Sequence, residues 1–251
     1  MSVLRAAAFF DLDGTLISQA SMTSFLEFYF AHTRPAEAER LWREFWEAGS
    51  ALRQAGATRE QQNAWFYERQ FADADIAELS RLAVLWLARQ TERPDFFRHG
   101  VLARLLQHRA QGCEIVLVTG SFREIVALFA KAIGASTFLC APLEEINGRY
   151  TGKLTAAPMI GAGKASAIQR YLAQHGITAD DCFAYGDDDS DIDMLNAVGK
   201  PHVVSNCTER LLAHARLEGW PVVAADDEES SDAVQLFLEK MQPTEPAGFS
   251  L

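Results

Sequence analysis

The sequence has few cysteines and no long apolar run, and each absence excludes a class of protein. Only four of the 251 residues are cysteines, and they are widely scattered. No pair of them has the spacing of a zinc site, so we interpret them as reduced thiols, mostly buried. No uninterrupted apolar stretch reaches the length of a membrane span, and we therefore expect no membrane contact.

The sequence also lacks any block of lysine or arginine. It carries 34 acidic and 23 basic side chains, for a formal net charge of -11. An acidic chain of this kind is a poor candidate for binding nucleic acid or an anionic membrane, although a few cations in one pocket can still hold a small anionic substrate. The first five residues lack the layout of a signal peptide, which makes a cytoplasmic location the default expectation. The sequence makes no prediction of oligomeric state.

The stretch at residues 8–16 shows where chemistry is expected. There an apolar run ends in Asp11 and Asp13, followed by Gly14 and Thr15. Alternate residues of an extended chain share a face, so the two carboxylates are expected side by side just past a buried strand. Such a pair resists joint ionisation, and a hard divalent cation such as Mg²⁺ relieves the repulsion. This stretch therefore predicts a cation site.

Short apolar runs alternate with helical patterns over most of the chain, which predicts an α/β core around a parallel sheet. Strands are expected at residues 4–10, 114–118, 136–141, 182–185, 202–205 and 220–223. Three of these strands lead into polar groups: Asp11 with Asp13, a Thr-Gly-Ser turn at 119–121, and Asp187 with Asp191. Because ligands bind beyond the carboxyl ends of parallel strands, we expect these groups to meet at one edge of the sheet.

A different pattern separates the first strand from the second. Between residues 22 and 92, aromatic and aliphatic side chains recur at helical spacing without any strand signal. This pattern predicts three or four helices whose aromatic stripe forms the core of a bundle. Farther along, Asn147-Gly148 between β-prone runs predicts a hairpin. The predicted division of the chain is a core domain at residues 1–16 and 93–241, a helical cap domain at 17–92 and a flexible tail at 242–251.

A single lysine joins these polar groups as a fourth candidate element of the site. Lys164 follows Gly-Ala-Gly and precedes a helical pattern. The carboxylate pair, the hydroxyl turn, this lysine and the second acidic cluster occur in an order that resembles the haloacid dehalogenase (HAD) superfamily of hydrolases. The closest branch is subfamily IB, which includes phosphoserine phosphatase and carries a helical C1 cap between the first two motifs. The resemblance covers about residues 6–225 and implies a Rossmann-like three-layer core with a central parallel sheet, plus an all-α cap inserted after the first strand.

The resemblance implies a role for each motif residue. Asp11 is the implied nucleophile, which attacks phosphorus and becomes an aspartyl-phosphate, and Asp13 is the implied general acid and base. Thr119 is implied to donate its hydroxyl to a phosphoryl oxygen, and Lys164 to neutralise the phosphate and hold Asp11. Dehalogenases of the superfamily lack an acid at the position of Asp13, so its presence favours phosphoryl transfer.

The resemblance also implies Mg²⁺ as the cofactor. Asp187 matches the metal ligand of the fourth motif, and Asp191 matches the partner that shapes its surroundings. The implied metal-binding set is Asp11, Asp13, Asp187 and Asp191. Asp188 and Asp189 are open between a contact to metal-bound water and a role as solvated loop acids.

The cap is expected to close over the site and read the leaving group. Phosphoserine phosphatases carry a glutamate shortly after the first motif that reads the substrate amine. Residues 17–22 contain no acid here, which argues against serine phosphate. For Arg123, a pocket role and a surface position are equally open. The candidate substrate-binding residues are Gly120, Ser121 and Arg123 after the second strand, and Ser18, Gln19, Ser21, Met22 and Phe25 at the start of the cap.

The leading hypothesis is a Mg²⁺-dependent phosphatase that hydrolyses a phosphate monoester of a small metabolite through an aspartyl-phosphate. One alternative is a phosphatase for phosphoserine or an amino-alcohol phosphate such as histidinol phosphate. Another is a phosphotransferase that passes the phosphoryl group to an alcohol. The last is a non-catalytic binding module, against which the intact Asp11, Asp13, Lys164 and Asp187 argue.

Overall fold

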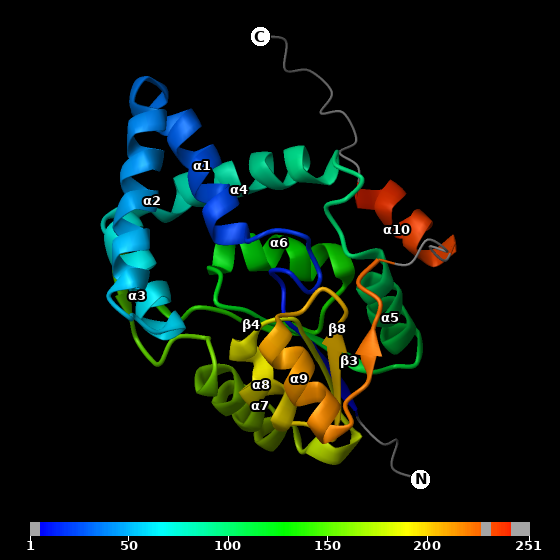
Figure 1. Cartoon of the computed structure of the whole chain (residues 1–251). Coiled ribbons are helices and arrows are strands. Elements are labelled where there is room, and N and C mark those ends of the chain that lie inside the picture. Colours follow the sequence, from blue (N-terminus) through cyan, green and yellow to red (C-terminus); the bar gives the residue numbers. More distant parts are fainter. Residues whose placement is uncertain (1–5, 227–231, 242–251) are drawn as a thin grey trace.

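The computed structural model describes residues 6–226 and 232–241, and a six-stranded sheet lies at its centre (Figure 1). The strand order is β4-β3-β1-β7-β8-β9, and all neighbouring strands run parallel. The strands are β1 (Ala7–Phe10), β3 (Glu114–Val118), β4 (Thr137–Leu139), β7 (Phe183–Gly186), β8 (Lys200–Val204) and β9 (Val222–Val223). Because β1 lies between β3 and β7, the three strands that precede the polar motifs are neighbours.

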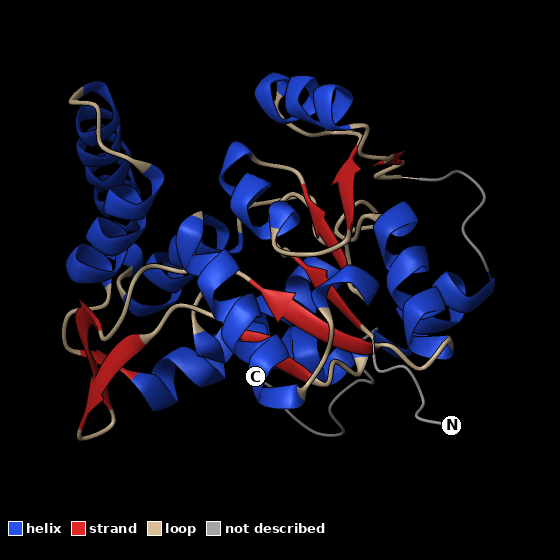
Figure 2. Ribbon diagram, turned by 90° about the horizontal axis from the view of Figure 1, so that it is seen from below, coloured by secondary structure: helices blue, strands red, loops and turns tan. Residues whose placement is uncertain are grey.

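Helices cover both faces of the sheet, as its almost entirely apolar central strands require (Figure 2). Along β1, Ala8 and Phe10 belong to the apolar cluster under α5, α6 and α10, whereas Ala7 and Phe9 belong to the cluster under α7, α8 and α9. The helices are α5 (His99–Ala110), α6 (Arg123–Ile133), α7 (Ala162–His175), α8 (Ile192–Asn196), α9 (Glu209–Glu218) and α10 (Asp232–Met241), with 3-10 turns at Ala179–Asp181 and Asp189–Asp191. The predicted three-layer α/β fold is confirmed.

Residues 21–91, between β1 and α5, form an insert whose helices stand to one side of this core (Figure 1). They are α1 (Ser21–Thr33), α2 (Ala38–Gln54), α3 (Arg59–Gln70) and α4 (Ile76–Thr91), with a 3-10 turn at Pro35–Glu37. Thr58 begins α3 with a capping box, and the Asp75 carboxylate caps α4 by accepting the Glu78 N–H. The buried aromatic side chains of these helices join the cluster on one face of the sheet, so the insert and the core share apolar packing.

One short strand in the insert corrects the prediction of an all-α cap. β2 (Ala74–Asp75) pairs antiparallel with β6 (Arg149–Leu154), whose other neighbour is β5 (Leu143–Ile146). β5 and β6 form the predicted hairpin, and Asn147 and Gly148 both have positive φ, as a two-residue type I′ turn requires. Two residues are too few to show a strand period, and β2 pairs only because the hairpin reaches the insert.

The last described helix, α10, has no counterpart among the predicted elements. Its Phe237 ring packs edge-on against Phe97, with ring centroids 5.7 Å apart. The predicted flexible tail at 242–251 lies outside the described residues. Within the described ranges, no helix combines the length and the apolar character that crossing a membrane requires.

Candidate active site

The carboxylate of Asp11 lies at the carboxyl end of β1 and is paired with a buried lysine. The Nζ atom of Lys164, in the first turn of α7, lies 2.6 Å from Oδ1 of Asp11 and 2.7 Å from Oδ1 of Asp191. The side chains of Asp11, Lys164 and Asp191 are 8%, 3% and 0% exposed. Burial raises the pKa of Asp11 well above its usual value, although Lys164 opposes this shift. Burial alone would lower the pKa of Lys164, but the two carboxylates outweigh it and raise that pKa, so the lysine stays charged.

Asp187 and Asp191 follow β7 and complete a cluster of three acids with Asp11. One carboxylate oxygen from each lies within 4.8 Å of the others. Thr15 donates its hydroxyl to Oδ1 of Asp187 over 2.6 Å, and Oδ2 of Asp191 accepts the backbone N–H groups of Asp187 and Asp188. Burial and the charge of Asp191 raise the pKa of Asp187 to about 7. A divalent cation among these oxygens relieves the repulsion, so the donor set fits Mg²⁺.

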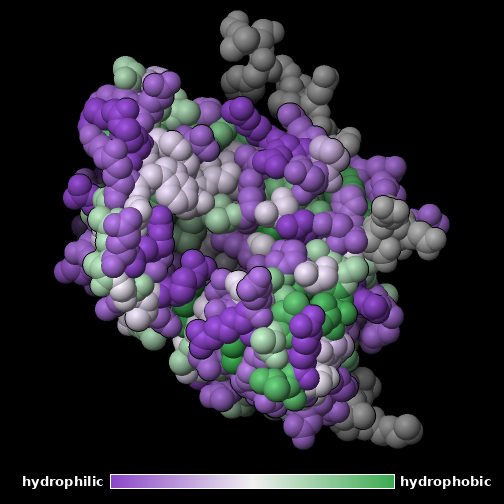
Figure 3. Space-filling model, viewed as in Figure 1, coloured by the Kyte–Doolittle hydropathy of each residue, from purple (hydrophilic) through white to green (hydrophobic). Residues whose placement is uncertain are grey.

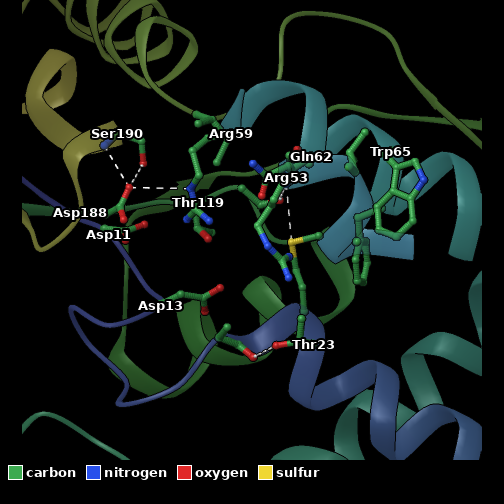
Figure 4. Close-up of a pocket in the computed structure, with 18 of the residues that line it drawn as sticks. Asp11, Asp13, Thr23, Arg53, Arg59, Gln62, Trp65, Thr119, Asp188 and Ser190 are labelled. Carbon is green, nitrogen blue, oxygen red and sulfur yellow. Dashed lines mark hydrogen bonds and ion pairs between the residues drawn. The ribbon is translucent and has the colours of Figure 1, made fainter. Parts of the chain in front are cut away.

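Asp13 lies beside this cluster and faces the cavity between the core and the insert (Figure 4). Its carboxylate is not one of the three clustered acids, so the structure divides the predicted metal-binding set. The backbone N–H of Ser21, at the start of α1, donates to Oδ1 of Asp13 over 3.0 Å. Burial raises the pKa of Asp13, and the hydrogen bonds from Ser21 only partly oppose that shift. A carboxyl with a raised pKa is suited to carry a proton.

Gly14 follows Asp13 in the turn after β1, at a position where no side chain fits. Its φ is +82°, and a Cβ atom there would lie 2.2 Å from Oδ2 of Asp187. The glycine therefore provides both the left-handed backbone and the room for the acidic cluster.

The loop Thr119-Gly120-Ser121 follows β3 and is held from the insert. The Gly120 carbonyl oxygen accepts the Tyr67 hydroxyl over 2.7 Å and the Asn63 side-chain amide over 3.1 Å. Thr119 Oγ1 accepts the Ser121 N–H over 3.1 Å. Asn63 and Tyr67 both come from α3, so the insert orients this loop. The sequence interpretation missed both residues; the available signal was a pair of polar groups four residues apart on an aromatic helix face.

A cavity of about 310 Å³ lies between the core and the insert, where the space-filling surface is hollowed (Figure 3). Of the predicted residues, Asp11, Asp13, Thr119, Gly120 and Lys164 line its core side, and Met22 lines its insert side. Aromatic side chains of α2 and α3 form much of the remaining wall, although the sequence pattern had predicted a bundle core for them. They are Phe45, Trp46, Trp65 and Phe66.

The remaining predicted substrate-binding residues do not line the cavity. Phe25 is fully buried in the aromatic core, and Ser121 is fully buried with its hydroxyl bonded to that of Ser21. Gln19 is hydrogen-bonded to a glutamine of α4, outside the cavity, and Ser18 donates its backbone N–H to the loop before α5. Six predicted substrate-binding residues therefore do not line the cavity: Ser18, Gln19, Ser21, Phe25, Ser121 and Arg123.

Arg123 is paired instead of free. Its guanidinium lies 3.1 Å from a carboxylate oxygen of Glu124 and 3.1 Å from one of Glu145, and its side chain is 49% exposed. These contacts hold it on the surface of α6.

Of the two loop acids left open by the sequence, Asp188 lines the cavity. Burial raises the pKa of Asp188, but hydrogen bonds from Ser190 outweigh this effect and leave the pKa below its usual value. Asp189 accepts a hydrogen bond from the Thr208 hydroxyl and does not line the cavity.

The fold and the site together define a class of protein: a three-layer α/β enzyme with carboxylates and one lysine gathered at the carboxyl ends of parallel strands. Comparison with known families narrows the class. The profile of the haloacid dehalogenase-like hydrolases matches residues 8–196, and the chain belongs to this family.

Similar proteins include named phosphatases. A probable phosphatase of Mycobacterium tuberculosis is 32% identical over 88% of this chain and 75% of its own length. A phosphoserine phosphatase of the same species is 27% identical over 87% of this chain and 70% of its own length. A solved structure from Bordetella pertussis, of unknown function, superposes with a TM-score of 0.75 at 27% identity and covers 88% of this chain and 98% of that one. The prediction of a phosphatase-type hydrolase of the HAD superfamily is confirmed by these relatives.

Proposed function

We propose that this protein is a Mg²⁺-dependent phosphatase that hydrolyses a phosphate monoester of a small metabolite through a phosphorylated Asp11. The observation that carries the proposal is the buried contact of 2.6 Å between Asp11 and Lys164, which both line a cavity that Thr119 also lines. A carboxylate fixed at a strand end beside a permanent positive charge is arranged to attack an electron-poor phosphorus atom.

The reaction uses two carboxylates in turn. An oxygen of Asp11 forms a bond to phosphorus while the bond from phosphorus to the ester oxygen breaks, and Asp13 gives its proton to the departing alcohol. Asp13 then takes a proton from water as the water oxygen attacks phosphorus, which releases inorganic phosphate and restores the Asp11 carboxylate. The raised pKa of Asp13 supports its role as the initial proton donor.

The remaining polar groups position and neutralise the phosphate. Lys164 and the Thr119 hydroxyl are suited to contact phosphoryl oxygens, because both residues line the cavity near Asp11. Mg²⁺ would be held by Asp11 and Asp187, with Asp191 orienting the loop, and supplies positive charge against the phosphate when bound. The bonds from Tyr67 and Asn63 to Gly120 hold the Thr119 loop in place.

Phosphate release from p-nitrophenyl phosphate, measured with Mg²⁺ and with EDTA, tests the proposal. We expect turnover only with Mg²⁺, and a loss of about 10³-fold or more in Asp11→Asn, because the nucleophile is removed. Asp193→Asn is the matched control, since Asp193 is an exposed acid on α8 outside the cavity. Equal and negligible rates with Mg²⁺ and EDTA would refute the enzymatic proposal, and full activity of Asp11→Asn would refute the nucleophile.

A further inference from the structure

We infer that the organic part of the substrate is a bulky apolar group, preferably aromatic, that carries a second negative charge instead of an amine. This inference rests on the proposed phosphatase function and specifies its substrate class. It follows from the chemistry of the cavity wall that the insert forms.

The apolar character of that wall comes from aromatic rings of α2 and α3. Phe45 and Phe66 are at least nine-tenths buried, and the Phe45 ring lies nearly parallel to that of Trp65, with centroids 5.8 Å apart. Trp46 is 42% exposed, which is unusual for so large an apolar side chain, and it lines the same cavity. Rings held in this way stack on a planar or apolar ligand and release the water between them.

The charge of the wall is positive. Among the described residues that line the cavity, every carboxylate belongs to the core: Asp11, Asp13 and Asp188. The insert contributes two arginines, Arg53 and Arg59, and both point into the cavity (Figure 4). A substrate ammonium group would find no acid of the insert to bind, so phosphoserine and amino-alcohol phosphates fit this wall poorly.

The two arginines differ in their interaction partners. Arg59 lies 3.8 Å from a carboxylate oxygen of Asp188 and is partly neutralised there. Arg53 makes no ion pair within the described part of the chain, and its guanidinium lies over the Trp46 ring at 5.7 Å. A guanidinium beside an aromatic wall is suited to bind the carboxylate of an aromatic acid, because the ring stacks while the fork of N–H groups takes the anion. Lys164 already serves the phosphate end, so Arg53 is available for this second anion.

A series of phosphate esters with similar primary-alcohol leaving groups tests the inference. The series is 2-phenylethyl phosphate, its 4-carboxy and 4-aminomethyl derivatives, and O-phosphoethanolamine. We expect 2-phenylethyl phosphate to exceed O-phosphoethanolamine in kcat/KM by about tenfold or more, because an aromatic ring is transferred from water to the cavity. The 4-carboxy ester should in turn exceed the 4-aminomethyl ester by about tenfold or more, because only the carboxylate pairs with Arg53.

Two variants assign the preference to its residues. In Arg53→Gln, the advantage of the 4-carboxy ester over the 4-aminomethyl ester should fall from about tenfold to nearly none. Trp46→Ala should reduce the advantage of 2-phenylethyl phosphate over O-phosphoethanolamine by about fivefold or more. Arg43→Gln is the matched control, because Arg43 is an exposed arginine of the same helix that does not line the cavity; its ratios should equal those of the unaltered protein.

Two outcomes would overturn the inference. One is a kcat/KM for O-phosphoethanolamine equal to or above that of the aromatic esters. The other is an equal loss for all four esters in Arg53→Gln, which would mean that Arg53 binds the transferred phosphate. Direct binding of the matching non-hydrolysable phosphonates, measured by calorimetry, separates this test from the proposed function. Selective binding of the 4-carboxy phosphonate without turnover of any ester would refute the phosphatase and retain the ligand class.

Discussion

Replacing Lys164 by methionine tests whether the buried charge cluster is held together by one cation. The Nζ atom of Lys164 contacts Asp11 and Asp191 at 2.6 and 2.7 Å, and none of the three side chains is more than 8% exposed. Methionine retains most of the volume of the lysine stem and removes its charge. In Lys164→Met, two buried carboxylates lose their cationic partner at once.

The expected cost is large because the carboxylates cannot reach water. Removing one partner of a buried ion pair typically costs about 3–5 kcal/mol, and we expect a loss of this size in the free energy of unfolding at pH 7.5. The loss should shrink at pH 5.5. Without the lysine the folded-state pKa of Asp11 rises further above its unfolded value, so protonation stabilises the variant as the pH falls.

Urea unfolding in EDTA, followed by circular dichroism at both pH values, measures this difference. Lys131→Met is the matched control, because Lys131 is an exposed lysine in the last turn of α6, and its effect should stay within about 0.5 kcal/mol. The double variant Lys164→Met/Asp11→Asn should be more stable than Lys164→Met alone, since one of the two uncompensated carboxylates is replaced by a neutral amide. Neither variant should turn over substrate.

The reasoning would be refuted by a Lys164→Met protein that is as stable as the unaltered protein at pH 7.5. It would also be refuted if the double variant lost the sum of the two single effects, because independent sites add and coupled sites do not.

Three further predictions concern the loops around the site and a histidine of the core. Tyr67→Phe removes a donor to the Gly120 carbonyl, so we expect a stability loss of about 1 kcal/mol in urea unfolding and a lower kcat with little change in KM; an unchanged kcat would contradict this. Gly14→Ala places a Cβ atom against Asp187, and the Mg²⁺ concentration for half-maximal activity should rise about tenfold or more; no rise would contradict the cluster as a metal site. Burial and the nearby His202 lower the pKa of His108 from 6.5 to about 4, so its contribution to stability is complete above pH 6.5 and is lost as the pH falls toward 4. Melting temperatures between pH 7.5 and 5 should therefore fall more steeply for the unaltered protein than for His108→Gln, and parallel curves would contradict the shift.

The core side of the candidate site was predictable because of its topology. Asp11 and Thr119 each follow an apolar strand, and in a parallel sheet the ends of such strands meet at one edge. Asp187 follows β7, the other neighbour of β1, so the same rule brings it to this edge. Lys164 lies in the first turn of α7 after the β5–β6 hairpin, so its place was implied by its position in the order of the family's motifs and not by the end of a core strand. The hairpin turn at Asn147 was predictable for a similar local reason, since its backbone conformation suits few residues.

The insert side was not predictable in the same way. Phe25 and Trp46 both belong to helical segments whose aromatic side chains recur at helical spacing, yet Phe25 is fully buried and Trp46 lines the cavity. Periodicity identifies the apolar face of a helix and does not say whether that face meets another helix or a cavity. Arg123 likewise follows the Thr119 loop closely, but two glutamates hold it on the surface.

From the sequence alone, the class of enzyme, the α/β core and the carboxylates at the strand ends of this protein were determined, because short-range patterns and chain order specify them. Only the tertiary structure decided that β2 joins the insert to the hairpin, that Tyr67 and Asn63 hold the Gly120 carbonyl, and that Arg53 faces the cavity. Each of these features brings together segments that lie far apart in the chain. Their geometry depends on how the insert packs against the core, which no local pattern records.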